Sequence, residues 1–180
     1  YTGGNYSVQA MNGLTLDVPL IAQYVAPYRT VDELPPCIII NFSENMLRVF
    51  EGNGELIWWC NCGYGRGWED GEDFSSPRGL HYIEYKDPAP TWTNPDPTGW
   101  GKDYKAFYAA GDPENPMGSR ELKISDAPMV FIHGVFNQAL TYVNLSHGCI
   151  NVYDPDMIEL YDIIPEPSEC KDEIWVLLHD

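Results

Sequence analysis

Three short runs of β-branched and aromatic residues, divided by turn residues, most constrain the fold of this chain. The runs are "CIIINF" at 37–42, "MLRVFE" at 46–51 and "ELIWWCNCG" at 55–63, with "SEN" and "GNG" between them. Such runs, separated by short turns, are typical of antiparallel strands joined by hairpins. The pattern predicts a β meander here, and further strands are predicted at 80–85, 129–134 and 173–178.

One short helix is predicted near the C-terminus, in "YDPDMIELYDIIP". Asp154 is the expected N-cap and Pro155 suits the first helical position, while Pro165 ends the helix. The apolar face at helical spacing consists of Met157, Leu160, Tyr161 and Ile164. Together with the strands, this single helix predicts a mainly β protein.

Two long segments lack a periodic apolar pattern. Residues 63–79 are predicted to be a loop, and residues 86–119 are dominated by Pro, Gly, Asp, Asn and Trp. A segment of the second kind is usually a lid or binding loop, or is disordered. Its aromatic residues favour an ordered cover: Trp92, Trp100, Tyr104, Phe107 and Tyr108. Residues 1–36 form an N-terminal arm and approach segment, with 16–25 expected to be extended.

Length and charge narrow the class of protein. The 180 residues fit one compact domain, and no apolar run approaches the roughly 20 residues that span a bilayer. No export signal is recognisable, although one that had been removed would leave no trace. The net charge of −17 argues against nucleic acid and anionic membrane surfaces as partners, because both need basic patches.

The cysteine count is odd, so at least one thiol is free in a fully oxidised monomer. An exported protein could form two disulfides among Cys37, Cys60, Cys62 and Cys170 and leave Cys149 free, whereas all five could be reduced in a cytosolic protein. Cys60 and Cys62 are two residues apart, so on a strand they share a face and do not easily bond to each other.

The stretch "NLSHGCINV" at 144–152 carries the candidate chemistry. Cys149 is a candidate nucleophile, which needs a base to ionise its thiol near neutral pH. His147 is two residues away and on an extended backbone need not reach the sulfur. His133 lies 16 residues upstream, at the end of a separate predicted strand. We favour His133 as the base and expect its ring within or near hydrogen-bond reach of the sulfur.

Two other readings of the same residues stay open. Cys149 could be a small buried hydrophobic residue, which is a common environment for a thiol. A zinc site from His133, His147 and Cys149 is the second alternative, but the paired ligand spacing of such sites and a fourth ligand are missing.

The sequence resembles the L,D-transpeptidase catalytic domain (the YkuD-like fold). "IHG" at 132–134 followed by "SHGCIN" at 146–151 matches the family signature in residue types and in the His-to-Cys gap. "SSPRGLHYI", "APTWTNPDP", "GDPENPMGSRELKI" and "EIWVLL" resemble further family segments, so the resemblance covers roughly residues 18–178. It implies a mixed or antiparallel β-sandwich with one or two short helices and a long lid loop. It also divides the chain into an arm at 1–17 and a catalytic domain at 18–180.

The resemblance implies a cysteine acyltransferase that acts on peptidoglycan stem peptides in the cell envelope, periplasmic or extracellular, and contributes to wall biogenesis and cell shape. Cys149 would form a thioester, His133 would move the proton, and backbone N–H groups of His147, Gly148 and Cys149 would hold the oxyanion. Ser146 and His147 would orient the turn and the base. No cofactor or metal is implied, and a wall-anchored protein could be an acceptor. A carboxypeptidase or amidase using the same site is the first alternative, and a non-catalytic wall-binding module is the second.

Several residues depart from the family pattern or would meet the substrate. Position 151 is Asn where many relatives carry Arg, and an amide cannot fork onto a carboxylate as a guanidinium does. Asn151 and Gly134 are candidate substrate-binding residues. Arg120, and more weakly Lys123 or Arg78, are the candidates for binding substrate carboxylates.

Overall fold

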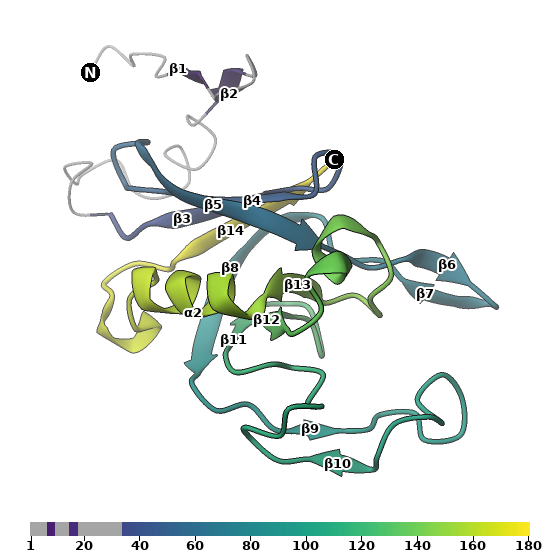
Figure 1. Cartoon of the computed structure of the whole chain (residues 1–180). Coiled ribbons are helices and arrows are strands. Elements are labelled where there is room, and N and C mark those ends of the chain that lie inside the picture. The colour runs from purple at the N-terminus through teal and green to yellow at the C-terminus, as the bar shows by residue number, and fades with distance from the viewer. Residues whose placement is uncertain (1–6, 10–14, 18–33) are drawn as a thin grey trace.

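The computed structural model describes residues 7–9, 15–17 and 34–180, and eight strands of the last range close into a barrel (Figure 1). The order around the barrel is β11-β12-β13-β5-β4-β3-β14-β8. Neighbours are antiparallel except for the parallel pairs β12–β13 and β14–β3. The barrel strands are β3 (Cys37–Asn41), β4 (Met46–Phe50), β5 (Leu56–Gly63), β8 (Gly79–Asp87), β11 (Glu121–Ile124), β12 (Phe131–Val135), β13 (Ile150–Tyr153) and β14 (Trp175–His179).

Two long strands, β5 and β8, each belong to both walls of the barrel. Residues 56–61 of β5 pair with β4 and residues 62–63 pair with β13. Residues 79–82 of β8 pair with β14, and the rest of β8 pairs with β11. The barrel can therefore be described as two sheets that share their edge strands, and the predicted mainly β class is confirmed.

Alternation along the strands decides which side chains fill the barrel and which face outward. Ile38 and Ile40 of β3 are fully buried in the main core, as are Leu122, Ile132 and Ile150 of the opposite wall. Because successive side chains on a strand point to opposite faces, the residues next to the last three lie on the outer face of that wall. Cys60 and Cys62 both lie in the main core, as their spacing predicts, and all five cysteines are free thiols.

The predicted helix is present as α2 (Asp154–Ile163), but its start is one residue earlier than expected. Tyr153 is the N-cap and Asp154 is already helical. The Asp154 carboxylate does not cap its own helix, because Ser119 donates to it from both its backbone N–H and its hydroxyl. Three of the four predicted face residues, Met157, Leu160 and Ile164, are inaccessible to solvent, whereas Tyr161 is partly buried and packs against the core.

The segment 63–79, predicted to be a loop, contains a hairpin of β6 (Gly67–Glu69) and β7 (Glu72–Phe74). Its two-residue turn is Asp70-Gly71, with φ values of 51° and 89°. Asp-Gly with positive φ at both positions is a favoured hairpin turn, so this signal was present in the sequence and was missed. The hairpin projects from the barrel at the end of β5 (Figure 1).

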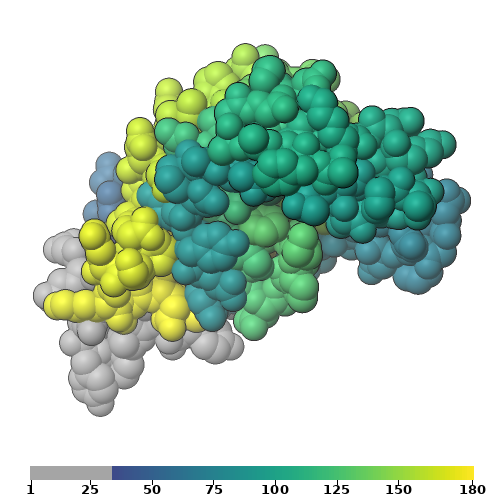
Figure 2. Space-filling view, turned by 90° about the horizontal axis from the view of Figure 1, so that it is seen from below, coloured from purple at the N-terminus to yellow at the C-terminus, as the bar shows by residue number. Residues whose placement is uncertain are grey.

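The long segment between β8 and β11, here called the lid (residues 88–118), contains one small pair of strands, β9 (Trp92–Thr93) and β10 (Phe107–Tyr108). Figure 2 shows it in teal-green over one side of the molecule. Two short 3-10 helices, η2 (Gln138–Tyr142) and η3 (Pro167–Glu169), complete residues 34–180. In the part of the chain that the structure describes, no helix combines the length and apolar character needed to cross a membrane.

Near the N-terminus, β1 (Ser7–Gln9) and β2 (Thr15–Asp17) pair antiparallel within the predicted arm. The predicted domain boundary and most of the predicted extended stretch at 16–25 lie outside the described residues.

Lys86 of β8 supplies the cation that α2 lacks in its own last turn. Its ammonium donates to the carbonyls of Tyr161 and Ile164 and lies 4.0 Å from the centre of the Tyr161 ring. We expect Lys86→Met to lower the free energy of unfolding by about 1–2 kcal/mol, because the helix C-terminus loses its donor and its counter-charge. Urea denaturation measures this. Lys171→Met, at an exposed position, is the control and should change stability little.

Candidate active site

A cavity of about 350 Å³ lies at the outer face of β12 and β13, beneath the lid. His133, Cys149 and Asn151 line it together, and the motif residues Ser146 and His147 do as well. The lid adds aromatic and apolar walls, and so does the crossover from β12 to β13. These further lining residues are Trp92, Trp100, Tyr104, Pro113, Glu114, Asn115, Pro116, Met117, Val135, Phe136, Leu140 and Leu145.

The parallel pairing of β12 with β13 brings the two candidate catalytic residues together. His133 is directly opposite Asn151, and Cys149 stands two residues before Asn151. Cys149 immediately precedes β13, and strand alternation places it on the same side as position 151. The thiol and the imidazole both line the cavity. The local sequence produces this arrangement because Ile132 and Ile150 are drawn into the core.

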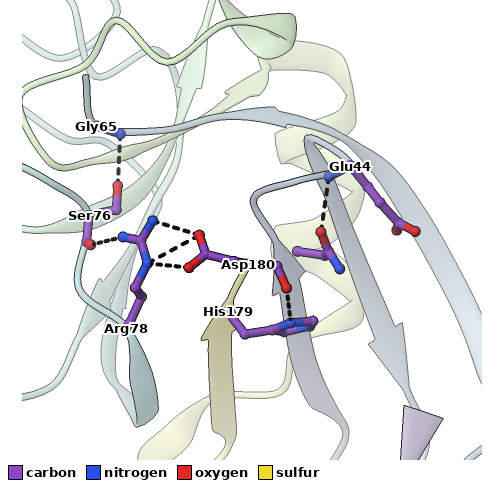
Figure 3. A network of polar contacts seen from close by, with 7 residues as sticks. Glu44, Gly65, Ser76, Arg78, His179 and Asp180 are labelled. Carbon is purple, nitrogen blue, oxygen red and sulfur yellow. Dashed lines mark hydrogen bonds and ion pairs between the residues drawn. The ribbon is translucent and has the colours of Figure 1, made fainter. Parts of the chain in front are cut away.

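The turn before Cys149 is shaped by hydrogen bonds to its backbone. Ser146 Oγ donates to the Cys149 carbonyl at 2.6 Å and accepts from the Gly148 N–H at 3.2 Å. Gly148 has φ +112°, a conformation that side chains strain, which explains the glycine. The buried Ser76 hydroxyl donates to the Gly148 carbonyl and accepts from the Gly65 N–H, both at 2.8 Å; Figure 3 shows the latter contact. Ser76 was not predicted, and it ties the turn to the end of β5.

His133 is buried and its ring orientation is set by the backbone. Its Nδ1 lies 2.9 Å from the Gly134 carbonyl, and a carbonyl only accepts, so Nδ1 carries the proton and Nε2 is left as the basic nitrogen. Burial lowers the pKa of His133 to about 4, although the Gly134 carbonyl and Asp154 oppose the shift. His133 is therefore neutral near pH 7, as a base must be before it accepts a proton.

Cys149 is half-buried, and its thiol is uncharged at neutral pH. Burial raises the pKa of Cys149 to about 11, opposed by the Phe131 backbone; Glu121 contributes to the rise. The thiol donates to the Met129 carbonyl at 3.5 Å, and among residues 34–180 no hydrogen bond joins it to the His133 ring. The two groups share the cavity, and in this arrangement the hydrogen bond of the neutral thiol goes to a backbone carbonyl.

Gly134 has a structural reason to be glycine. A Cβ at this position would lie 2.2 Å from Asp154 Oδ1. The Asp154 carboxylate is buried and accepts from the Ser119 N–H at 2.8 Å. Gly134 is not among the residues that line the cavity, and its carbonyl is the one that orients His133.

A row of residues crosses the outer face through His133. Glu121 of β11 is directly opposite His133, and Asp87 of β8 is opposite Glu121. Glu121 is 7% exposed, and no hydrogen bond or ion pair reaches its carboxylate within residues 34–180. Burial and then Asp87 raise the pKa of Glu121 to about 7, while Lys123 opposes the shift. A carboxyl that is partly protonated at neutral pH therefore lies one strand from His133.

The predicted carboxylate-binding cations lie away from the cavity wall. Arg120 donates to the carbonyls of Pro88 and Ser119, both at 2.7 Å. Lys123 donates to carbonyls of the turn after β11, and Arg78 pairs with Asp180 at 2.7 Å (Figure 3). Backbone carbonyls and the side-chain carboxylate of Asp180 bind these cations, and no Lys or Arg is among the described residues that line the cavity.

Metal-ligand clusters are not found in the described ranges: no three His, Cys, Asp or Glu side chains come together there as a metal site. The two remaining histidines, His81 and His179, hydrogen-bond to backbone oxygens of Ser125 and Asp180.

Known proteins share the sequence pattern and the fold of this chain. A model of the L,D-transpeptidase catalytic domain family matches residues 35–171. The chain belongs to the L,D-transpeptidase family. It is 28% identical over 161 residues to the probable L,D-transpeptidase ErfK/SrfK of Escherichia coli (strain K12), covering 86% of this chain and 47% of that protein. The chain thus spans about half the length of this curated relative.

Solved structures of L,D-transpeptidases share the fold. An L,D-transpeptidase from Mycobacterium smegmatis has a TM-score of 0.60 at 16% identity, over 81% of this chain and 59% of that one. The structure of LdtMt1 in complex with imipenem has a TM-score of 0.57 at 14% identity, over 80% and 58%.

The Gly134–Asp154 contact predicts the effect of one methyl group. We expect Gly134→Ala to lower the free energy of unfolding by about 1–3 kcal/mol, because the new Cβ overlaps the buried carboxylate. Thermal denaturation measures the loss, and Asp154→Ala in the same background should recover part of it. Additive losses in the double variant would contradict a direct clash.

The raised pKa of Glu121 predicts a dependence of stability on pH. In the folded protein the carboxyl holds its proton to about pH 7, whereas the unfolded chain loses it near its ordinary value of 4.5. The folded state binds more protons in this window, so this residue makes stability fall as the pH rises from about 4.5 to 7, by up to about 3 kcal/mol. Glu121→Gln should reduce the fall, and urea denaturation at pH 5 and pH 8 measures it.

The matched control for this experiment is Glu84→Gln. Glu84 is a more exposed carboxylate beside Lys123, so its removal relieves no buried charge. An equal change of pH slope in both variants would contradict the assignment to Glu121.

Proposed function

We propose that this protein is a cysteine acyltransferase that joins peptidoglycan stem peptides through a Cys149 thioester. The observation that carries the proposal is that Cys149 and His133 meet in one lidded cavity from adjacent parallel strands. Family membership supports the same chemistry. The proposed catalytic domain is residues 18–180, with residues 1–17 as an arm, and its place is the cell envelope, periplasmic or extracellular.

The first half-reaction forms the thioester. Sγ of Cys149 attacks the carbonyl carbon of the third residue of a tetrapeptide donor, and its proton passes to Nε2 of His133. When the tetrahedral intermediate collapses, the C–N bond to the terminal D-alanine breaks, and His133 returns the proton to the leaving amine. Since thiol and imidazole are both neutral at rest, charge separation arises only during attack, and the sulfur must turn from the Met129 carbonyl toward the ring.

The second half-reaction transfers the acyl group. A neutral amine of an acceptor peptide attacks the thioester carbon and loses a proton to His133. Collapse of the intermediate breaks the C–S bond, and His133 returns the proton to the Cys149 sulfur. The oxyanion of both steps is assigned to the backbone N–H groups of His147 and Cys149. Gly148, also a candidate, already donates to Ser146. A donor of this kind contributes about 3 kcal/mol to the transition state. Asn151, opposite His133 in the cavity, is the proposed partner for a peptide amide or carbonyl.

The cavity wall favours transfer over hydrolysis. Its lid residues are largely aromatic and apolar, which limits water at the thioester. A carboxypeptidase or amidase would use the same thioester with water as acceptor, and a wall-anchored protein could supply the amine in place of a second stem peptide. A non-catalytic wall-binding module would retain the fold but not need the thiol.

Incubation with disaccharide-tetrapeptide separates these functions by mass. Cross-linked dimers with release of D-alanine are the expected products, whereas tripeptide alone would assign the protein to the hydrolases. Cys149→Ser and His133→Gln should each lower the rate by at least about a hundredfold. Imipenem should add its mass to the wild-type chain and not to Cys149→Ala. Unchanged wall binding by Cys149→Ala, with no adduct on the wild type, would leave only the binding module.

A further inference from the structure

The ring of His147 is enclosed by three side chains that lie outside the motif. Trp100 of the lid stacks on it, with centroids 3.7 Å apart and planes 21° apart. Phe74 of the β6–β7 hairpin meets it edge-on at 4.8 Å. Arg66, at the start of that hairpin, donates from Nη2 to His147 Nε2. The position of this imidazole is therefore set by the lid, the hairpin and one guanidinium.

Arg66 is itself held in place by backbone and side-chain contacts. Its N–H donates to the Ser146 carbonyl, and the Ser146 N–H donates to the Tyr64 carbonyl, both at 3.1 Å. Its Nε lies 2.7 Å from Glu69, and its guanidinium lies 4.5 Å from the centre of the Phe74 ring. An isolated β-bridge joins the residue before Arg66 to Ser146 of the motif. The fold therefore fixes the direction in which the guanidinium points toward His147.

This contact determines the protonation of His147. A guanidinium has donors only, so His147 Nε2 must accept and cannot carry a proton. The ring is then neutral with its proton on Nδ1, and within residues 34–180 no acceptor is found for that N–H. His147 also lines the cavity that holds Cys149.

We propose that Arg66 is a positioning residue: it fixes His147 as the neutral Nδ1–H tautomer, and thereby gives the cavity a hydrogen-bond donor for a carbonyl oxygen of the acyl-donor peptide. This inference rests on the proposed function, and it adds a residue that the motif does not contain.

The charges around His147 agree with this role. Burial and then Arg66 lower the pKa of His147 to about 4, and Asp96 of the lid opposes the shift. Glu69 acts on the ring indirectly, since its carboxylate pairs with Arg66. Removal of the guanidinium leaves Asp96 as the charged group acting on His147, so the ring should take up a second proton at a higher pH than in the wild type.

The tautomer is measured directly by two-dimensional ¹H–¹⁵N NMR of the histidine rings, with His147→Gln to assign the signals. In the wild type we expect Nε2 unprotonated and Nδ1 protonated. In Arg66→Met we expect loss of this single tautomer and protonation of the ring at higher pH, whereas Arg66→Lys, which still donates, should retain it. An Nε2–H tautomer in the wild type would overturn the inference without any variant.

Kinetics supply the second readout. Arg66→Met should raise KM for the tetrapeptide donor about tenfold, the loss expected for one hydrogen bond of about 1.4 kcal/mol, and add an acid limb to the pH profile. The matched control is Arg78→Met, because Arg78 also pairs with a carboxylate, that of Asp180 (Figure 3). Its guanidinium likewise lies over an aromatic ring, 4.7 Å from the centre of Phe42. An unchanged pH profile and KM in Arg66→Met would make Arg66 a structural contact only.

The two proposals fail in different ways. If imipenem and tetrapeptide left Cys149 unmodified in the wild type, the acyltransferase function would fail, while the NMR tautomer would still report on Arg66. If acylation proceeded normally and Arg66→Met changed neither tautomer nor KM, only the Arg66 inference would fail.

Discussion

The parallel pairing of β12 with β13 is the interaction on which the rest of the site depends. Its register sets His133 opposite Asn151 and leaves Cys149 two residues away on the same face. The register is held by apolar side chains on the inner face, where Ile132 and Ile150 are fully buried. A slip of one residue would turn every side chain of a strand to the other face, so core packing and the geometry of the candidate site are specified together.

The site is assembled around neutral groups. Burial disfavours charge on both His133 and Cys149, and it keeps Glu121 largely protonated below neutral pH. In a chain of net charge −17, these three groups therefore add little charge of their own near neutral pH or below it. The backbone then supplies much of the local polarity: carbonyls of Gly134 and Met129 contact His133 and Cys149.

The sequence predicted those parts of the fold whose signal is local. Strands β3, β4 and β5 have contiguous apolar runs, and the buried face of α2 follows helical spacing. Strands β11 and β13 were not predicted, because each has only four residues and its outward positions carry polar side chains such as Glu121 and Asn151. The motif residues around Cys149 were found together, but Arg66 contacts His147 across 81 positions of sequence, and no local pattern reports such a contact. Arg120 illustrates the reverse case, since its charge alone could not reveal that nearby carbonyls bind it.

Parallel neighbours cannot be joined by a tight turn, so the chain must travel from the end of β12 back to the start of β13. Here that return path carries Phe136, Leu140 and Leu145 along the cavity. The stretch that topology requires is therefore also the stretch that shapes the space beside the thiol. Changes of length or bulk within residues 136–145 could remodel the chamber while the spacing of His133 and Cys149 stayed locked by the sheet. In such a scaffold, the preference for a substrate would then change without moving His133 or Cys149.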